Sequence, residues 1–520
     1  MSLKDYSREI IELILSGKIS SKEELDKIKL KTARKHFLEV FPSNPDIICF
    51  ASAKERQNKK LDLLSIKPIR SLSGIVSVAI MPKPLPCPGK CIYCPSSLLP
   101  DVITPKSYTG REPTTMRAIS NDFDAVKQIQ NRISQLQLTG HSTEKIELIV
   151  MGGTFLSAPL SYQKKFMLDC FNAVNNTTSF SLEKAIDKAQ HSKNRLIGIT
   201  FETRPDFCGK KEINNLLSFG ATRVELGVQT LDDKIYEKIK RGHKVSDVIN
   251  STSLLRDSCF KFAYHLMPGL PGSTPKEDLR VFKKVFSDPC FKPDMLKIYP
   301  CLVIKGTELY EDWKKGNFEP YSTQKAAKLI ARMKSFVPEW VRIMRIQRDI
   351  PSTVVSGGVK HTNLRQLIEV EMKKHGWKCS CIRCREIGRA KEKISKPELV
   401  VQEYDASNGK EFFISIKDKN SLYGFCRLRF PFSPFRKELT NKTALLRELH
   451  VYSKALALSE LPEENEFQHK GFGKTLLAKA EEIALNAGYN KLAVISGVGA
   501  REYYWKLGYK NDGPFVSKLL

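Results

Sequence analysis

The chain has 520 residues, with 85 Lys and Arg against 57 Asp and Glu, so its formal net charge is +28. At roughly 150 residues per domain this length predicts about three domains, and an apolar fraction of 41% excludes a wholly disordered chain. No segment approaches the roughly 18 consecutive apolar residues of a membrane-spanning helix, and the charged N-terminus lacks a signal-peptide pattern. We therefore expect a cytoplasmic protein without membrane contact, whose charge favours a nucleic-acid partner.

Residues 1–70 are predicted to form a basic helical region. Tyr6, Ile10, Leu13 and Ile14 recur at helical spacing. The segment that follows carries five basic residues and no acid between positions 27 and 36: Lys27, Lys29, Lys31, Arg34 and Lys35. Such a run is either a solvated helix face or an arm that contacts the phosphates of tRNA, and the sequence favours neither.

From residue 71 to about 350, short apolar segments alternate with amphipathic ones. Strands are expected at 74–81, 145–153, 195–202, 223–229, 262–269 and 295–300. Helices are expected between them, for example at 122–138, 162–175 and 275–287. This alternation predicts an α/β domain with a parallel sheet. Six strands favour a partial (βα)6 barrel, and a doubly wound sheet is the alternative.

Three cysteines, Cys87, Cys91 and Cys94, follow the first expected strand in the sequence CPGKCIYCP. Three thiolates in one loop can hold three irons of a [4Fe–4S] cluster and leave the fourth iron open for another ligand. Zinc is the alternative, but structural zinc usually takes four protein ligands, and no fourth ligand is near in the sequence.

Polar residues mark the ends of the next strands. Gly152 and Gly153 follow the second strand, Glu202 ends the third, and the fourth carries Glu225 and Gln229. In βα barrels the carboxyl ends of the strands form the active site. Each of these residues has an ordinary structural role as its alternative.

Lys297 lies on the apolar sixth strand, where a buried ammonium needs a counter-charge or a ligand. We therefore include it among the candidate catalytic residues.

Residues 351–400 form a basic segment with a second cysteine cluster: Cys379, Cys381 and Cys384. In a cytosolic chain a tight cluster predicts a metal site rather than disulfides. We interpret the segment as a linker held by zinc, with His375 or His361 as the candidate fourth ligand. A second iron–sulfur cluster is the alternative.

Residues 401–520 show a second α/β pattern. Strands are expected at 411–416, 423–430, 444–452 and 491–497, and a long helix at 472–486. A glycine-containing loop precedes that helix: Gln468, His469, Lys470, Gly471, Phe472 and Gly473. Its backbone N–H groups can converge on a pyrophosphate at the helix N-terminus. A plain turn is the alternative.

Two motifs carry a family resemblance. The spacing CxxxCxxC after the first strand resembles that of radical S-adenosylmethionine (SAM) enzymes, and Q-x-x-G-x-G resembles the coenzyme A loop of GNAT acetyltransferases. Both on one chain, together with ETRPD (202–206), LKIYP (296–300) and LRELHVY (446–452), resemble the family of Elongator catalytic subunits from about residue 65 onward. The chain departs from that family in a shorter Cys87–Cys91 spacer and in Ser96-Ser97, where the family has two glycines.

The resemblance implies cofactors and a reaction. A [4Fe–4S] cluster, SAM and acetyl-coenzyme A would be bound, and a deoxyadenosyl radical would abstract hydrogen from the acetyl methyl group. The carbon radical would then add to carbon 5 of the wobble uridine of tRNA. SAM would contact Gly152, Gly153, Glu202, Glu225 and Gln229, and Tyr504 would protonate the departing thiolate of coenzyme A.

The same resemblance implies other Elongator subunits as partners. A protein lysine acetyltransferase with a structural iron–sulfur domain is the alternative function, and a non-catalytic tRNA-binding scaffold is another.

Overall fold

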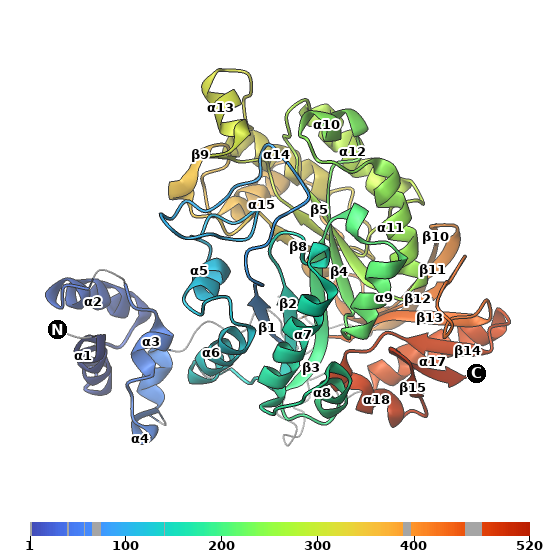
Figure 1. Cartoon of the computed structure of the whole chain (residues 1–520), viewed down its shortest axis with the longest axis horizontal. Coiled ribbons are helices and arrows are strands. Elements are labelled where there is room, and N and C mark those ends of the chain that lie inside the picture. The colour runs from blue at the N-terminus through green and yellow to red at the C-terminus, as the bar shows by residue number, and fades with distance from the viewer. Residues whose placement is uncertain are drawn as a thin grey trace.

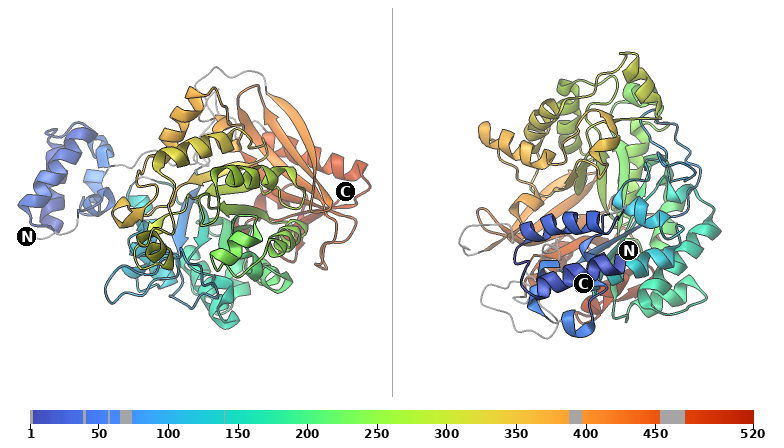
Figure 2. Two further views of the ribbon diagram at one scale, coloured as in Figure 1. Left: turned by 90° about the horizontal axis from the view of Figure 1, so that it is seen from above. Right: turned by 90° about the vertical axis from the view of Figure 1, so that its left-hand side faces the viewer.

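The computed structural model describes residues 3–38, 41–56, 58–64, 74–139, 141–387, 397–452 and 471–520. Its first part is a helical module next to the main body of the molecule, where α3 lies beside α6 (Figures 1 and 2). The module consists of α1 (Leu3–Leu15), α2 (Lys22–Lys35), α3 (Asn44–Ile48), α4 (Ala53–Arg56) and the 3₁₀ helix η1 (Lys59–Leu64). Tyr6, Ile10 and Ile14 are fully buried in its core, as their helical spacing predicts.

A seven-stranded parallel sheet forms the centre of the molecule. Its strands are β1 (Val76–Ile80), β2 (Lys145–Val150), β3 (Arg195–Thr203), β4 (Arg223–Gln229), β5 (Lys261–Leu266), β6 (Met295–Ile298) and β8 (Arg342–Ile346). They lie side by side in chain order without the reversal of a doubly wound sheet, which excludes that alternative. The sheet curls, and β1 does not pair with β8 in the described part of the chain, so the barrel is partial (Figure 1). All six predicted strands are confirmed, and β8 is an additional one.

Helices follow most of these strands and cover the sheet. They are α5 (Pro113–Ile119), α6 (Ala125–Leu138), α7 (Leu160–Asn175), α8 (Leu182–Ala189), α9 (Lys210–Ser218), α10 (Asp233–Lys238), α11 (Val245–Asp257), α12 (Pro275–Ser287), α13 (Glu308–Lys314), α14 (Thr323–Lys334), α15 (Leu364–Lys374) and α16 (Ile382–Arg385). A short antiparallel pair, β7 (Val303–Ile304) and β9 (Val355–Gly357), lies apart from the main sheet. Among the described residues, no helix is long and apolar enough to span a membrane.

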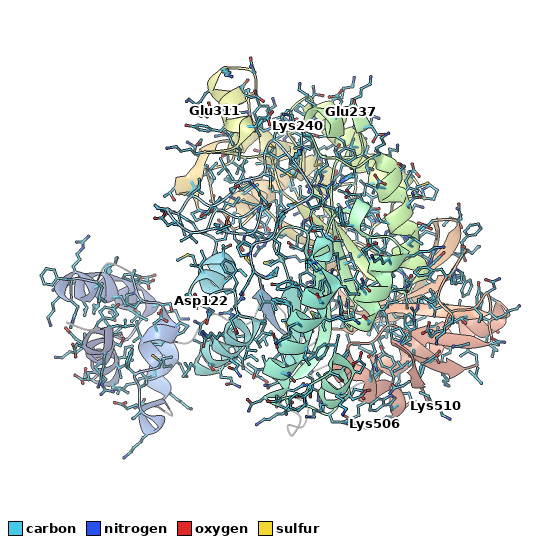
Figure 3. All side chains as sticks on the ribbon, in the orientation of Figure 1. Asp122, Glu237, Lys240, Glu311, Lys506 and Lys510 are labelled. Carbon is cyan, nitrogen blue, oxygen red and sulfur yellow. The ribbon has the colours of Figure 1, made fainter. Side chains whose placement is uncertain are left out.

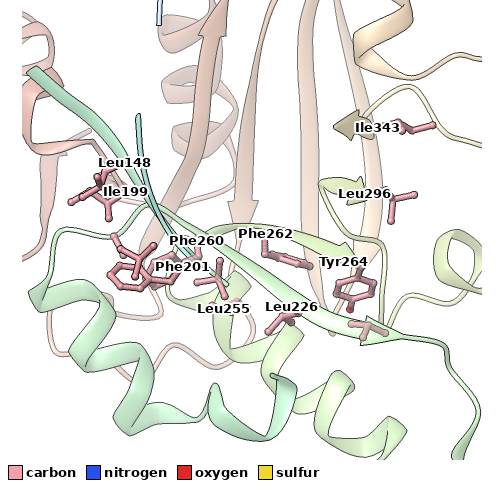
Figure 4. Packing of buried hydrophobic residues seen from close by; sticks show 14 of the residues in the cluster. Leu148, Ile199, Phe201, Leu226, Leu255, Phe260, Phe262, Tyr264, Leu296 and Ile343 are labelled. Atoms are coloured by element: carbon pink, nitrogen blue, oxygen red, sulfur yellow. The ribbon is translucent and has the colours of Figure 1, made fainter. Parts of the chain in front are cut away.

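The two faces of the central sheet differ in polarity. Leu148, Phe201, Leu226 and Tyr264 are buried in the apolar core (Figure 4). The neighbouring positions on the strands point to the other face because side chains alternate along a strand. On that face Glu202 pairs in register with Glu225, His265 with Lys297, and Lys297 with Arg345. The polar face therefore carries the residues that sequence analysis selected.

The C-terminal domain has its own seven-stranded sheet. Its strands follow the order β10 (Glu398–Ala406), β11 (Gly409–Lys417), β12 (Leu422–Phe430), β13 (Thr443–Val451), β14 (Lys491–Val494), β16 (Phe515–Leu519) and β15 (Lys510–Asp512). All pairs are antiparallel except β13 with β14. Helix α17 (Phe472–Asn486) has the bounds that the sequence predicts and packs on one face of this sheet, and α18 (Arg501–Trp505) follows β14.

The other face of the C-terminal sheet packs against the amino-terminal ends of the barrel strands. Leu445 and Phe413 belong to the same hydrophobic core as Leu296 and Phe262 of the barrel. The two domains therefore share one continuous core. Charged residues of both signs lie on the periphery, where Figure 3 labels Lys240, Lys506 and Lys510 as well as Asp122, Glu237 and Glu311. The predicted domain boundaries at residues 70, 350 and 400 stay predictions.

Candidate active site

The loop after β1 holds the first cysteine cluster at the carboxyl edge of the barrel sheet. The Sγ of Cys87 lies 3.6 Å from the hydroxyl of Thr154, which follows β2. In the described part of the chain, two groups of three side chains have all their potential metal-ligand atoms within 4.8 Å of one another. Cys87, Cys91 and Cys94 do not form such a group, so their sulfurs are spread more widely. Their wider spread suits a multi-iron cluster better than a single ion.

Two buried arginines, Arg241 and Arg204, lie next to this cysteine loop. Arg241 donates from Nη1 to the Sγ of Cys91 at 3.4 Å and from Nη2 to the carbonyl of Gly227 at 2.5 Å. The Nη1 of Arg204 is buried without a hydrogen-bond partner, and a Cβ at Gly89 would lie 2.2 Å from it. A larger residue at position 89 would therefore displace the Arg204 guanidinium, and two cations lie close to the three thiols. This environment fits an anionic thiolate-bound cluster.

A buried charged network lies on the polar face of the sheet. Lys297 Nζ contacts Glu202 at 3.1 Å and also pairs with Glu225. His265 Nε2 lies 2.8 Å from the same Glu225 carboxylate, and Tyr108 donates to Glu202 at 3.3 Å. Burial lowers the pKa of Lys297, but Glu225, with Tyr299 and Glu202, raises it more, so the net shift is upward.

Glu225 titrates in the opposite direction. Burial raises its pKa, but Lys297, His265 and Arg223 lower it well below the usual range. Lys297 is therefore an ammonium and Glu225 a carboxylate at neutral pH. The structure brings together the predicted residues Glu202, Glu225 and Lys297, and it adds His265 and Tyr108, which were not among the predicted site residues.

The remaining predicted SAM contacts lie at the same edge of the sheet. Gly152 and Gly153 follow β2 with φ of 118° and 61°, which glycine adopts without strain. A Cβ at Gly152 would lie 3.1 Å from Pro105, so the loop after the cysteines packs directly on this turn. Gln229 ends β4 with φ of 71°, and its Oε1 is buried without a partner. A strained residue with an unpaired carbonyl at a strand end suits ligand binding.

The second cysteine cluster is compact. The sulfurs of Cys379, Cys381 and Cys384 all lie within 4.8 Å of one another, close enough to bind one ion. Neither His375 nor His361 is in that group of ligand atoms. The His375 ring stacks on Trp377 with centroids 4.5 Å apart, and its Nε2 lies 3.6 Å from Glu371.

The predicted coenzyme A loop is described in part, because Gln468, His469 and Lys470 lie outside the described residues. Gly471 has φ of 79° and forms the N-cap of α17. A Cβ at Gly473 would lie 2.7 Å from the hydroxyl of Tyr503, so a larger residue at this start of α17 would require the Tyr503 side chain to move. Phe472 is the first residue of the helix, and the centroid of its ring lies 6.4 Å from that of Tyr423.

Tyr504 is buried in the core of the C-terminal domain beside Tyr503 and Tyr509. Burial raises its pKa, so the hydroxyl keeps its proton at neutral pH.

The basic residues of the N-terminal region fall into two classes. Lys27, Lys31, Arg34 and Lys35 are exposed on α2, and Lys35 pairs with Glu9 at 2.9 Å. Lys29 is only 4% exposed, and its Nζ donates to Asn44 at 2.9 Å. The Lys29 ammonium therefore holds α2 to α3, and its contact with phosphate stays a prediction.

Comparisons with known protein families match four segments of the chain. Residues 3–72 match the ELP3 N-terminal domain, and residues 86–285 match the Radical SAM superfamily. Residues 293–374 match the Radical_SAM C-terminal domain, and residues 383–509 match the acetyltransferase (GNAT) family.

Curated proteins are similar over almost the whole length. The tRNA uridine(34) acetyltransferase of Methanocaldococcus jannaschii is 48% identical over 98% of this chain and 97% of its own. Human Elongator complex protein 3 is 41% identical over 100% of this chain and 97% of its own. Among solved structures, Methanocaldococcus infernus Elp3 with an N-terminal deletion (1–46) superposes with a TM-score of 0.77 at 45% identity, covering 86% of this chain and 100% of that one.

Proposed function

The chain belongs to the family of tRNA uridine(34) acetyltransferases and Elongator complex protein 3, and we propose that it modifies the wobble uridine of tRNA. In this reaction the acetyl group of acetyl-coenzyme A is joined through its methyl carbon to carbon 5 of the base. The observation that carries the proposal is the fusion of two domains into one core. A three-cysteine loop lies at the active edge of the barrel, and the acetyltransferase domain packs on the same barrel.

The lysine acetyltransferase alternative explains less of the structure. It would use only the C-terminal domain and would leave the cysteine loop, the two buried arginines and the Lys297 network without a role. Those residues are costly to bury unless they are paired or bind a ligand, so their presence favours radical SAM chemistry.

Cys87, Cys91 and Cys94 would hold the [4Fe–4S] cluster. When bound, the cluster supplies the electron that cleaves SAM to an organic radical. The chain's own residues then have distinct tasks. Gly152 and Gly153 expose backbone polar groups to the methionine moiety, and Glu202, Glu225 and Gln229 present acceptors to its polar groups. Lys297 is a fixed cation that can hold an anionic group, because the adjacent carboxylates keep it protonated.

On the acetyl side, the loop at Gly471 and Gly473 would receive the pyrophosphate of coenzyme A at the N-terminus of α17. Gln468, His469, Lys470 and Phe472 would complete this loop. Tyr504 would donate a proton to the departing thiolate.

Mass spectrometry of wobble uridine tests the function. The protein is incubated under anaerobic conditions with tRNA, SAM, acetyl-coenzyme A and a reductant. We expect a carboxymethyl-type mass increase on uridine 34. Cys91→Ser should abolish both this product and SAM cleavage while leaving tRNA binding nearly intact. Efficient acetylation of lysine peptides, with unchanged uridine in the presence of tRNA, would favour the alternative.

We also propose that Cys379, Cys381 and Cys384 hold a structural zinc ion, which prefers thiolate ligands at about 2.3 Å in tetrahedral geometry. Elemental analysis should find about one zinc per chain in addition to iron, and Cys381→Ser should remove the zinc and leave the iron. Iron at this site in the Cys91→Ser variant would instead indicate a second cluster. Cytoplasmic localisation and association with further Elongator subunits stay predictions.

A further inference from the structure

Helix α2 ends in a conformation that its residue does not favour. The N–H of Phe37 donates to the carbonyl of Arg34 at 3.2 Å, and the N–H of Leu38 donates to Ala33 at 3.1 Å. These two bonds form a Schellman motif, in which the residue after the C-cap is usually glycine because its φ is positive. Phe37 occupies that position with φ of 52°. A bulky side chain is strained there, so the position does not favour phenylalanine for stability.

The ring of Phe37 gains nothing from burial either, because the residue is 90% exposed. The backbone turn instead projects the ring beyond the end of the helix. A strained and fully exposed aromatic residue contributes to neither the core nor the turn, and such outliers persist at functional positions.

The surface around Phe37 is positively charged. Lys27, Lys31 and Arg34 lie at helical spacing on the exposed side of α2, together with Leu30, which is 53% exposed. No ion pair joins Lys27, Lys31 or Arg34 to a carboxylate of the described residues, whereas Lys35 pairs with Glu9. No acid occurs between residues 27 and 37. The positive charges of this stripe are therefore not neutralised by a carboxylate of the described residues, and the stripe ends at the ring of Phe37.

We propose that this stripe, formed by Lys27, Leu30, Lys31, Arg34 and Phe37, binds an unpaired segment of tRNA, with a base stacked on Phe37. Proteins recognise single-stranded RNA by stacking bases on exposed aromatic rings next to cations that follow the backbone. In a duplex the bases are already stacked on one another, so a single exposed ring favours unpaired nucleotides. The inference rests on the proposed function for its tRNA partner.

The test measures the affinity of the full-length protein for a tRNA transcript and for a fully paired RNA duplex, each over a range of salt concentrations. Phe37→Gly should remove the ring and also relieve the positive φ, so its melting temperature should equal or exceed that of the wild type. Its tRNA affinity should fall roughly 5- to 100-fold, whereas its duplex affinity and the salt dependence of binding should stay unchanged. Phe37→Trp should retain the affinity for tRNA.

Two controls distinguish base stacking on Phe37 from electrostatic attraction and from non-specific binding to an exposed aromatic ring. Phe180 is 93% exposed in the loop before α8, so Phe180→Ala should not change tRNA binding. Replacing Lys27, Lys31 and Arg34 by Gln should reduce the slope of log affinity against log salt by roughly 0.7 per lost contact. Unchanged tRNA affinity in Phe37→Gly, or an equal loss for tRNA and duplex, would overturn the inference. If the Phe37 effect appears but the wild type never modifies uridine 34, the proposed function fails and the stacking surface stands.

Discussion

Arg241 is the residue whose position most affects the cysteine loop. Arg241 is 7% exposed, and its guanidinium donates to both the sulfur of Cys91 and the backbone of β4. A hydrogen bond and a positive charge beside a cluster sulfur stabilise the reduced state, because reduction adds negative charge. Arg241 is therefore a positioning residue that would also tune the reduction potential of the cluster.

Replacing Arg241 with Gln should make that potential more negative and reduce the iron retained per chain. The expected shift is about 60 mV for every 1.4 kcal/mol of lost stabilisation of the reduced state. Redox titration followed by electron paramagnetic resonance measures the potential. Arg280→Gln is the control, because Arg280 is exposed and lies 4.0 Å from Asp232. An unchanged potential with a full iron content would show that Arg241 has no influence on the cluster.

At the residue scale, sequence patterns identified the cysteines, Glu202, Glu225 and Lys297 because each lies directly on or after a recognisable strand. The partners of these residues could not be predicted. Arg241, His265 and Tyr108 contact them from other segments of the chain, and only the curled sheet brings them together. The burial of Lys29 could not be predicted from the sequence either, because its contact with Asn44 depends on how α2 and α3 pack.

Among the elements, strand β13 contacts the barrel through Arg447, which pairs with Asp294, and Glu448, which pairs with Lys261. The ring of His450 packs beside Phe425 and Tyr452, with centroids 6.1 and 4.5 Å away. Burial lowers its pKa to about 4, and Arg342 and Lys261 add to this effect, whereas Glu448 and Glu386 oppose it. His450 is therefore neutral in the folded protein at pH 7.

The lowered pKa predicts acid sensitivity of this strand. Between pH 6.5 and about 4 the unfolded chain binds a proton at His450 that the folded chain does not, so stability falls as the pH falls. At pH 5 the loss should be about 2 kcal/mol. Urea unfolding at pH 7.5 and pH 5 should show a smaller acid loss in His450→Gln than in the wild type. The exposed His191→Gln variant should behave as wild type, and equal losses in all three proteins would contradict the pKa shift.

Element prediction succeeded where the hydrophobic pattern was strong. The bounds of α17 were predicted as found, and the six apolar barrel strands are present. Strand β8 was missed because Arg342 and Arg345, the first and fourth of its five residues, interrupt the apolar run. Strands β10, β15 and β16 were missed because they are amphipathic or short, and their pairing partners define them more than their own composition does.

On the scale of the whole molecule, a balanced ionic network joins the two domains. Four arginines are almost fully buried: Arg256, Arg427, Arg429 and Arg447. They meet four buried carboxylates: Asp257, Asp294, Glu411 and Glu448. The barrel supplies Arg256, Asp257 and Asp294, and the C-terminal sheet supplies the rest. Separating the domains would leave charges of both signs without partners, so the domains should fold as one cooperative unit.

Asp294→Asn tests this coupling. The Asp294 carboxylate accepts two hydrogen bonds from Arg447, at 2.8 and 2.7 Å, and one from the N–H of Phe262 at 3.0 Å. Asn keeps the shape but leaves a buried guanidinium with one counter-charge fewer. We expect a loss of about 3–5 kcal/mol in the free energy of unfolding. Arg345→Gln is the control, since it breaks the partly exposed Arg345–Asp349 pair and should cost less than about 1 kcal/mol.

Hydrogen exchange measured by mass spectrometry shows whether that loss reaches both domains. In the wild type, peptides from β6 of the barrel and β12 of the C-terminal sheet should exchange through the same global opening, because Asp294, directly before β6, pairs with Arg427 of β12 across the domain boundary. Asp294→Asn should therefore speed exchange in both peptides by a similar factor, although the substitution touches one strand. Faster exchange confined to β6, with β12 as protected as before, would mean that the domains unfold independently and that the buried network only positions them.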